Sequence, residues 1–196
     1  VYGQNPNAGT AQMASAITLA TLLRATYPSI KICFVGSHPS ALPLDVLRHS
    51  CVDFVLLNEG VYALRDLLRT DLKSEISKVR GIGWKNLSGP ILNVPRNPVD
   101  TELMDIDLRG SAWDLLPYRS SPLDLYRSHL WHAGYKDENR TPFAAIYTSL
   151  GCQFKCEFCM INILNRVDNG AHIHAGNSAG MRFWSPEFII TEFDKL

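Results

Sequence analysis

One stretch of the chain, residues 147–160, decides how the rest is interpreted, and it reads YTSLGCQFKCEFCM. It places Cys152, Cys156 and Cys159 at the spacing C-x3-C-x2-C, directly after an apolar run over residues 143–147. Thiolates favour zinc, copper(I) and iron–sulfur clusters over hard cations. Three cysteines on one short loop can ligate three irons of a [4Fe–4S] cluster, which leaves the fourth iron open to a small molecule.

Other interpretations of these cysteines stay open. Cysteines often pack in a core, but Gln153, Lys155 and Glu157 make this loop polar. A disulfide would leave one of the three thiols unpaired. The sequence also shows no signal peptide that would direct the chain to an oxidising compartment. Zinc is the strongest rival, because it takes four nitrogen or sulfur ligands in a tetrahedron and His172 or His174 could supply the fourth.

The motif resembles that of the radical S-adenosylmethionine (SAM) superfamily, in which C-x3-C-x2-C follows a strand and an aromatic residue precedes the third cysteine. The resemblance implies that Cys152, Cys156 and Cys159 ligate a [4Fe–4S] cluster and that SAM chelates the open iron. One electron from the cluster would then cleave SAM to a 5′-deoxyadenosyl radical. It also implies that the backbone of Phe158 lies near the SAM adenine, and that an electron donor such as flavodoxin or ferredoxin reduces the cluster.

Upstream of the motif, helices alternate with continuous apolar strands. Helices are expected over residues 14–27, 43–49 and 61–72, and strands over residues 30–35 and 53–57. This alternation predicts an α/β fold that begins with a partial flavodoxin-like (Rossmann-type) parallel sheet covered by helices on both faces. Ligands of such sheets bind beyond the carboxyl ends of the strands, so the loops at residues 36–40 and 58–60 form a candidate site.

The apolar residues of this region are expected to face inward. Leu64, Leu67 and Leu68 recur at helical spacing and predict the buried face of the third helix. Cys33 and Cys51 lie in or beside strand-like runs and are expected to pack in the core.

The two loops resemble those of the cobalamin-binding domain that precedes many radical SAM domains. The resemblance covers about residues 2–72 and rests on GSHPSALP (36–43), VDFV (52–55) and NEG (58–60). The residues that it implies around the nucleotide tail of cobalamin are Gly36, Ser37, His38, Glu59 and Gly60. The motif D-x-H-x-x-G, with which related domains ligate cobalt, does not occur in this sequence. Three alternatives therefore stay open: cobalamin binds without a protein ligand to cobalt, the ligand lies on a missing strand, or cobalamin binding has been lost. His38 fits a hydrogen bond to the backbone as well as a contact with the nucleotide tail.

The remaining segments predict a linker and the start of a second domain. Residues 79–94 predict a hairpin that turns at Ser88, Gly89 and Pro90. The linker after it contains WDLLP (113–117), which resembles the bridge between the two domains of the same family. The domains expected are a cobalamin-binding-like domain over 1–78, a hairpin and linker over 79–140, and the first βα units of a radical SAM partial TIM barrel over 141–196.

Two predicted elements support the expected start of a barrel over residues 141–196. Residues 143–149 would form the first barrel strand, whose carboxyl end delivers the cysteine loop. Residues 185–196 predict a helix with Ser185 as N-cap and Pro186 at its first position. Its apolar face would consist of Ile189, Phe193 and Leu196.

Composition excludes several classes of function. The chain has 19 basic and 19 acidic residues, so it shows no electrostatic footprint for nucleic acid or an anionic membrane. No apolar run is long enough for a transmembrane helix. Five cysteines, three of them clustered, indicate a reducing cytoplasm. Because the chain begins at Val1 and its last predicted helix has no stop signal, a fragment truncated at both ends is expected.

Together, these resemblances imply a cobalamin-dependent type of radical SAM enzyme, for which methylation of an unactivated carbon or phosphorus is the usual outcome and ring contraction or cyclisation also occur. The alternatives are a methylthiotransferase-like radical SAM enzyme without cobalamin, a non-enzymatic zinc-binding module, and a scaffold whose cysteines only pack. A barrel needs on the order of 200 residues and only about fifty follow Phe143, so this chain alone is expected to turn over no substrate.

Overall fold

The computed structural model describes residues 10–72, 74–117, 120, 127–167 and 177–196. Packing gathers the chain into two compact units. One, which we call the sheet unit, consists of Val1–Asp100 and Gly151–Arg182; the other, the second unit, consists of Thr101–Leu150 and Phe183–Leu196. The cysteine loop therefore packs within the same unit as the N-terminal sheet, while the domain boundaries expected from the sequence stay a prediction.

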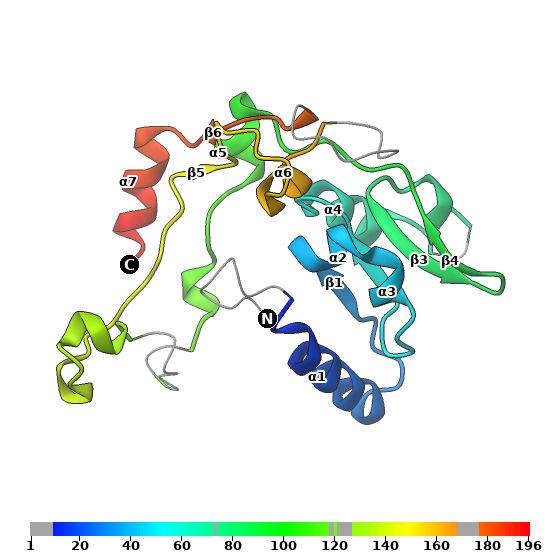
Figure 1. The fold of residues 1–196 in the computed structure, drawn as a ribbon, viewed down its shortest axis with the longest axis horizontal. Helices are drawn as coiled ribbons and strands as arrows, with labels where there is room; N and C mark the ends of the chain where they lie inside the picture. The colour runs from blue at the N-terminus through cyan, green and yellow to red at the C-terminus, as the bar shows by residue number, and fades with distance from the viewer. Residues whose placement is uncertain (1–9, 73, 118–119, 121–126, 168–176) are drawn as a thin grey trace. The chain divides into compact units, whose positions relative to one another are not determined.

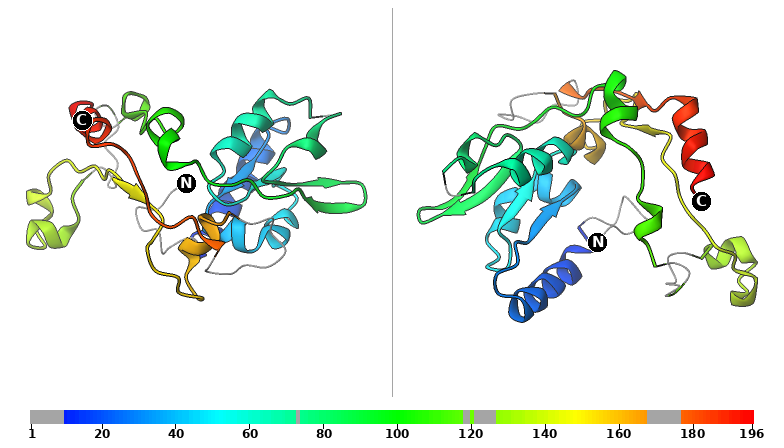
Figure 2. Two further views of the ribbon diagram at one scale, coloured as in Figure 1. Left: turned by 90° about the horizontal axis from the view of Figure 1, so that it is seen from above. Right: turned by 180° about the vertical axis from the view of Figure 1, so that it is seen from behind.

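A four-stranded mixed sheet forms the centre of the sheet unit (Figure 1). The strands β1 (Cys33–Val35) and β2 (Phe54–Leu56) pair in parallel, with Phe34 opposite Val55. The antiparallel strands β3 (Ile82–Asn86) and β4 (Gly89–Leu92) extend the sheet beyond β2 as a hairpin, which both views of Figure 2 show. The α/β class is confirmed, with a leading parallel pair compatible with a Rossmann-like domain.

Helices cover both faces of this sheet, as expected. The helices and the 3-10 turn of this region are α1 (Met13–Thr26), α2 (Ser37–Ala41), α3 (Pro43–Leu47), α4 (Val61–Arg69) and η2 (Ile76–Lys78). On one face Val55 packs with Ala20 of α1 and Leu47 of α3. On the other face Leu56 packs with Leu67 of α4. Because neighbouring strand residues point to opposite faces, β2 contributes to both cores. None of the described helices is long and apolar enough to cross a membrane.

Several side-chain expectations for this unit are wrong. Leu67 is buried, but Leu64 and Leu68 are 41% and 77% exposed. The reason is that α4 has nine residues and buries only Ala63 and Leu67, which lie four residues apart on one face. Cys51 lies in the core as predicted, whereas Cys33 is exposed.

The hairpin turns one step earlier than the sequence suggested. Asn86 pairs with Gly89, so Leu87 and Ser88 form the turn, and Gly89 and Pro90 belong to β4. The Asn86 side chain accepts a hydrogen bond from the Ser88 amide at 2.8 Å. This local bond is the Asx-type interaction that favours asparagine at turns.

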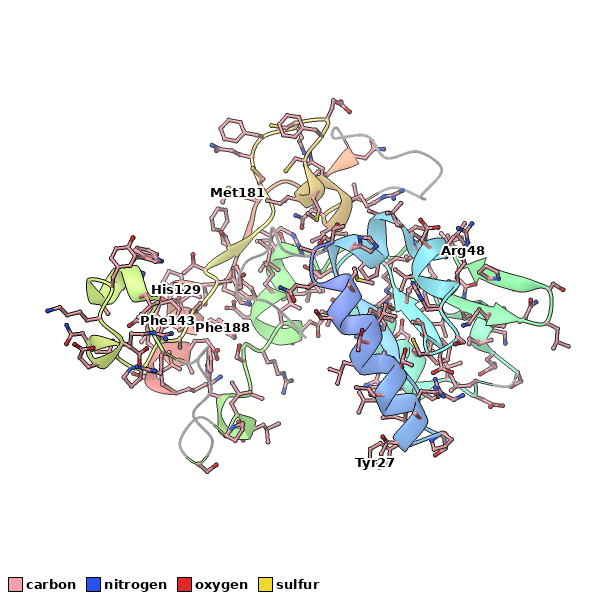
Figure 3. The ribbon with its side chains drawn as sticks, turned by 60° about the horizontal axis from the view of Figure 1, so that its bottom comes forward. Tyr27, Arg48, His129, Phe143, Met181 and Phe188 are labelled. Carbon is pink, nitrogen blue, oxygen red and sulfur yellow. The ribbon has the colours of Figure 1, made fainter. Side chains whose placement is uncertain are left out.

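The described residues of the second unit contain several short helices and the longer α7. They are η3 (Thr101–Leu103), α5 (Met104–Asp107), η4 (Trp113–Leu115), η6 (Leu130–Ala133), η7 (Asp137–Asn139) and α7 (Pro186–Asp194). The indole of Trp184 donates to the Leu108 carbonyl at 2.9 Å, and Asp105 accepts from the Ser185 amide at 3.0 Å. His129 and Phe143, labelled in Figure 3, form a tilted ring contact with centroids 5.7 Å apart and an interplanar angle of 52°.

The expected barrel strand over residues 143–149 is wrong in extent. The strand β5 covers only Ser149–Leu150, and it pairs with the equally short β6 (Arg182–Phe183). An extended run becomes a strand only where a partner supplies a hydrogen-bond ladder. Among the described residues, positions 143–148 belong to no strand, so a barrel stays a prediction.

The predicted start of α7 is confirmed, but its predicted apolar face is wrong at two of three residues, because only Ile189 is half-buried. Phe193 and Leu196 are 61% and 53% exposed, whereas Glu192 is 2% exposed. The Glu192 carboxylate accepts from the Ser111 amide and pairs with Lys195. Burial alone would raise the pKa of Glu192, but these donors outweigh it and hold the pKa below its usual value. A hydrogen-bonded carboxylate therefore lies on the inner side of this helix together with the half-buried Ile189.

We expect Ser185→Ala to destabilise the second unit by about 1 kcal/mol, the usual cost of removing an N-cap. The Ser185 hydroxyl accepts from the Phe188 amide at 3.1 Å, and alanine leaves this donor without a partner. Chemical denaturation followed by tryptophan fluorescence measures the loss. Ser185→Asp is the matched control, because aspartate caps equally well, and equal stability of the alanine and aspartate variants would contradict the assignment.

Candidate functional site

Two loops meet at the carboxyl edge of the parallel pair. β1 leads into Gly36, after which α2 begins, and β2 leads into Asn58. The Ser40 hydroxyl accepts from the Asn58 amide at 2.8 Å and donates to the Gly36 carbonyl at 2.7 Å. The structure thus brings together the two segments that the sequence marked as a candidate site. The first was expected to be a loop, but residues 37–40 belong to helix α2, with Gly36 as its N-cap.

The two glycines of these loops differ in their surroundings. Gly60 has φ +76°, and a Cβ at this position would lie 2.8 Å from Cγ2 of Val35. Close packing therefore accounts for this glycine without a ligand. Gly36 has φ +120° and no atom within 4 Å of its Cβ position, so its backbone borders open space.

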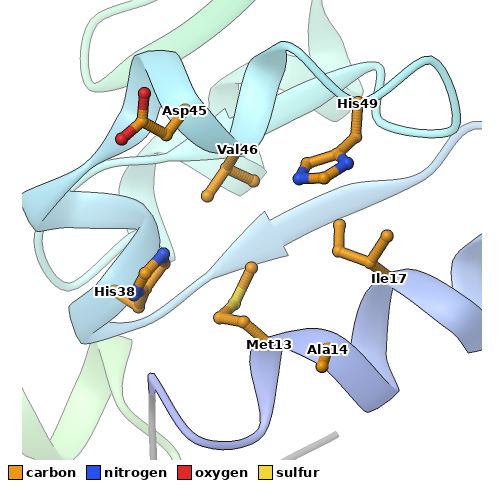
Figure 4. A pocket seen from close by; sticks show the side chains of 7 residues that line it. All are labelled: Met13, Ala14, Ile17, His38, Asp45, Val46 and His49. Carbon is orange, nitrogen blue, oxygen red and sulfur yellow. The ribbon is translucent and has the colours of Figure 1, made fainter.

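His38 lines a hollow between α1 and α3. Its Nδ1 lies 3.1 Å from the Thr10 hydroxyl. The hollow has a volume of about 200 Å³, and Met13 and His49 border it with His38 (Figure 4). Ser37, the first residue of α2, precedes this histidine.

Glu59 is engaged within the chain. Its Oε1 accepts from the Arg182 guanidinium at 2.7 Å. Its Oε2 accepts from the Arg182 guanidinium at 3.3 Å and from the Val99 amide at 2.7 Å. Arg182 also donates to the Val99 carbonyl at 2.6 Å and to Asn165 Oδ1 at 2.7 Å. Both carboxylate oxygens of Glu59 thus accept hydrogen bonds from within the chain, which gives this residue a structural role.

The three cysteines lie on a loop, residues 152–159, which is followed directly by the short helix α6 (Met160–Leu164). Cys156 is exposed, Cys152 and Cys159 are half-buried, and all three thiols are free. Cys159 is the N-cap of α6, and its amide donates to the Cys156 carbonyl at 3.0 Å. Asn162 donates to the same carbonyl at 2.8 Å. The spacing C-x2-C is thus a hydrogen-bonded turn that places its second cysteine at a helix start.

A strap formed by residues 177–182 supports this cysteine segment, by which we mean residues 151–167. Lys155 donates to the Ser178 carbonyl at 2.8 Å, and the Ala179 amide donates to the Asn165 carbonyl at 2.7 Å. A Cβ on Gly151 would overlap the carbonyl oxygen of Gly180. Helix α6 packs against α2, so the cysteine segment lies beside the candidate edge of the sheet (Figure 1).

The structure leaves the metal assignment open. Within the described ranges, no group of three or more His, Cys, Asp and Glu side chains is gathered closely enough to hold a metal ion. His172 and His174, the predicted alternatives for a fourth zinc ligand, lie outside the described residues. Phe158, the residue implied near SAM, is 93% exposed.

Sequence reasoning missed the polar residues that hold the cysteine segment. Asn162, Asn165 and Arg182 are 3%, 5% and 3% exposed. Arg182 offered a signal, because it is an arginine inside the otherwise apolar run Met181 to Trp184. A charged residue in such a run is rarely buried without a partner, but the partner cannot be identified from the local sequence.

The comparisons with known proteins give one distant relative. No family model matches the chain. The chain is similar to a protein of Pyrococcus horikoshii described as an uncharacterized methyltransferase, with 27% identity over 154 residues. The similarity covers 78% of this chain and 30% of that protein. The chain thus spans less than a third of the length of the curated relative it matches.

Proposed function

We propose that this chain is part of a radical SAM enzyme that transfers a methyl group, with a [4Fe–4S] cluster ligated by Cys152, Cys156 and Cys159. The observation that carries the proposal is the donor set: three free thiols within eight residues of one loop, all at least partly open to solvent. Thiolates are the ligands of such clusters. When bound, the cluster would supply SAM with the electron that cleaves its sulfonium bond.

The remaining residues of the segment would hold this donor set in place. Lys155 connects the loop to the Ser178 carbonyl of the strap, and Asn162 holds the Cys156 carbonyl. The exposed ring of Phe158 leaves its backbone accessible to the SAM adenine, as the family resemblance implies. A flavodoxin or ferredoxin in a reducing cytoplasm would deliver the electron.

Methyl transfer is the outcome that the relative supports. That protein is described as a methyltransferase, and both the radical SAM and the cobalamin resemblance are compatible with this reaction. Because the chain covers only part of that protein, the activity of the whole enzyme and its substrate stay proposals.

Cobalamin is proposed as a second cofactor at the edge of the sheet. The open backbone at Gly36 fits close approach of a ligand, and Ser37 and His38 follow it directly. Gly60 and Glu59 have structural roles of their own, so the nucleotide tail of cobalamin would contact mainly residues 36–40. Retention of a cobalt–corrin spectrum after the chain is incubated with cobalamin and desalted tests this assignment, and loss of all corrin colour would contradict it.

Anaerobic reconstitution with iron and sulfide tests the cluster. We expect about four iron atoms per chain and broad absorption near roughly 400 nm. Cys156→Ala should abolish both, because two thiols cannot hold the cluster. Cys33→Ser is the matched control, since Cys33 lies on β1 outside the segment, and it should keep the full iron content. Stoichiometric zinc without iron would favour the zinc-binding module, and unchanged iron in Cys156→Ala would refute the ligand assignment.

A further inference from the structure

Within the sheet unit, buried polar side chains connect the cysteine segment to the edge of the sheet. Both apolar clusters of the described residues lie within positions 13–84, well before the segment. Buried polar residues instead occur on α2 and the neighbouring edge loop, in the cysteine segment and in the strap. They are Ser40, Asn58, Asn162, Asn165, Arg166, Ser178 and Arg182. Hydrogen bonds are directional, so such a layer specifies the position of the segment more narrowly than apolar contact would.

Arg182 is the centre of this layer. Its guanidinium joins Glu59 of the sheet-edge loop, the Val99 carbonyl and the Asn165 side chain. The Arg182 side chain is 4% exposed and that of Glu59 is 14% exposed. A buried guanidinium is tolerated only when it is paired and hydrogen-bonded. Glu59 therefore makes the buried arginine possible, and the arginine in turn holds Asn165.

Asn165 transmits this position to the cysteines. It is the C-cap of α6, and both its backbone amide and its side-chain amide donate to the Ile161 carbonyl, at 3.1 and 3.2 Å. The same helix begins at Cys159 and carries Asn162, which holds the Cys156 carbonyl. Fixing the end of a five-residue helix fixes its start as well.

We propose that Arg182, paired with Glu59, is a positioning residue that couples the carboxyl edge of the sheet to the cysteine segment through Asn165. The role that this gives Glu59 differs from the cofactor contact implied by the sequence. The inference deepens the proposed function, since the positioned thiols are its metal ligands. The coupling itself is a property of the metal-free chain and can be measured without a cluster.

The test is the rate at which each cysteine of the reduced, metal-free chain reacts with a thiol reagent, read by mass spectrometry. The chain supplies its own reference, because Cys51 is buried in the core of the sheet unit. Arg182→Gln should raise the rates of the half-buried Cys152 and Cys159 roughly two- to tenfold, the range expected when a buried hydrogen bond is lost. Cys51 should keep its wild-type rate.

Two further variants make the result specific. Arg182→Lys should give intermediate rates, because lysine keeps the charge beside Glu59 but loses the planar fork that reaches several acceptors. Arg96→Gln is the matched control, since Arg96 forms a partly exposed ion pair with Asp66 away from the segment, and it should change none of the rates.

Two results would overturn the proposal. One is an unchanged rate for Cys152 and Cys159 in Arg182→Gln. The other is a parallel rise at Cys51, which would make Arg182 part of the general stability of the fold. Failure of the chain to bind iron would refute the proposed function but would leave the labelling result as a separate measurement.

Discussion

Leu47→Ala should lower the free energy of unfolding by about 2–5 kcal/mol, the range for truncating a fully buried leucine. Leu47, the last residue of α3, is 0% exposed and packs in the core against Val55 of the sheet. Its Cδ1 lies 2.9 Å from the Cβ position of Gly83 on β3, and glycine has no side chain that could move into the space that alanine would leave. The cost therefore contains the lost burial of the leucine and the cavity behind it.

Leu44→Ala is the control for this prediction, because Leu44 lies on the same helix and is 44% exposed. Substitutions at such positions usually change stability by less than about 0.5 kcal/mol. Urea denaturation of the two variants and the parent chain gives the comparison. Alanine is at least as good a helix former as leucine, so helix propensity cannot cause a loss in either variant. Equal losses in both would therefore contradict the burial of Leu47 as the source of the cost.

The parts of the fold that could be predicted are those encoded in local patterns. The run Phe54, Val55 and Leu56 is apolar throughout, and it forms the strand that is buried on both faces. The order serine, proline, acid at Ser185 produced the cap that the structure contains. In both cases neighbouring residues alone determine the outcome.

The parts that could not be predicted depend on partners far away in the chain. Glu59 and Arg182 are separated by 123 positions, and no local rule joins them. The strand expected over residues 143–149 shortens to Ser149 and Leu150, because only these residues meet a partner strand. Periodicity shows which residues can face a core, but it does not show where that core ends, as the exposed Leu68 of α4 demonstrates.

Gly151→Ala should displace the cysteine segment from its strap. Gly151 has φ +89°, and its Cβ would overlap the backbone carbonyl of Gly180. The left-handed conformation costs an L-residue about 1–2 kcal/mol, and the overlap adds about 1–3 kcal/mol because backbone atoms cannot rotate away as a side chain can. We expect faster labelling of Cys152 and, under the proposed function, a large loss of reconstituted iron.

Gly180→Ala separates the two contributions. Gly180 also has a positive φ, +77°, but no atom lies within 4 Å of its Cβ position. This variant should therefore show only the conformational cost and should keep most of its iron and its slow labelling at Cys152. If both glycine variants lose iron and gain reactivity to the same extent, backbone preference alone explains the effect, and the close approach of the strap to the cysteine segment is not what holds the thiols.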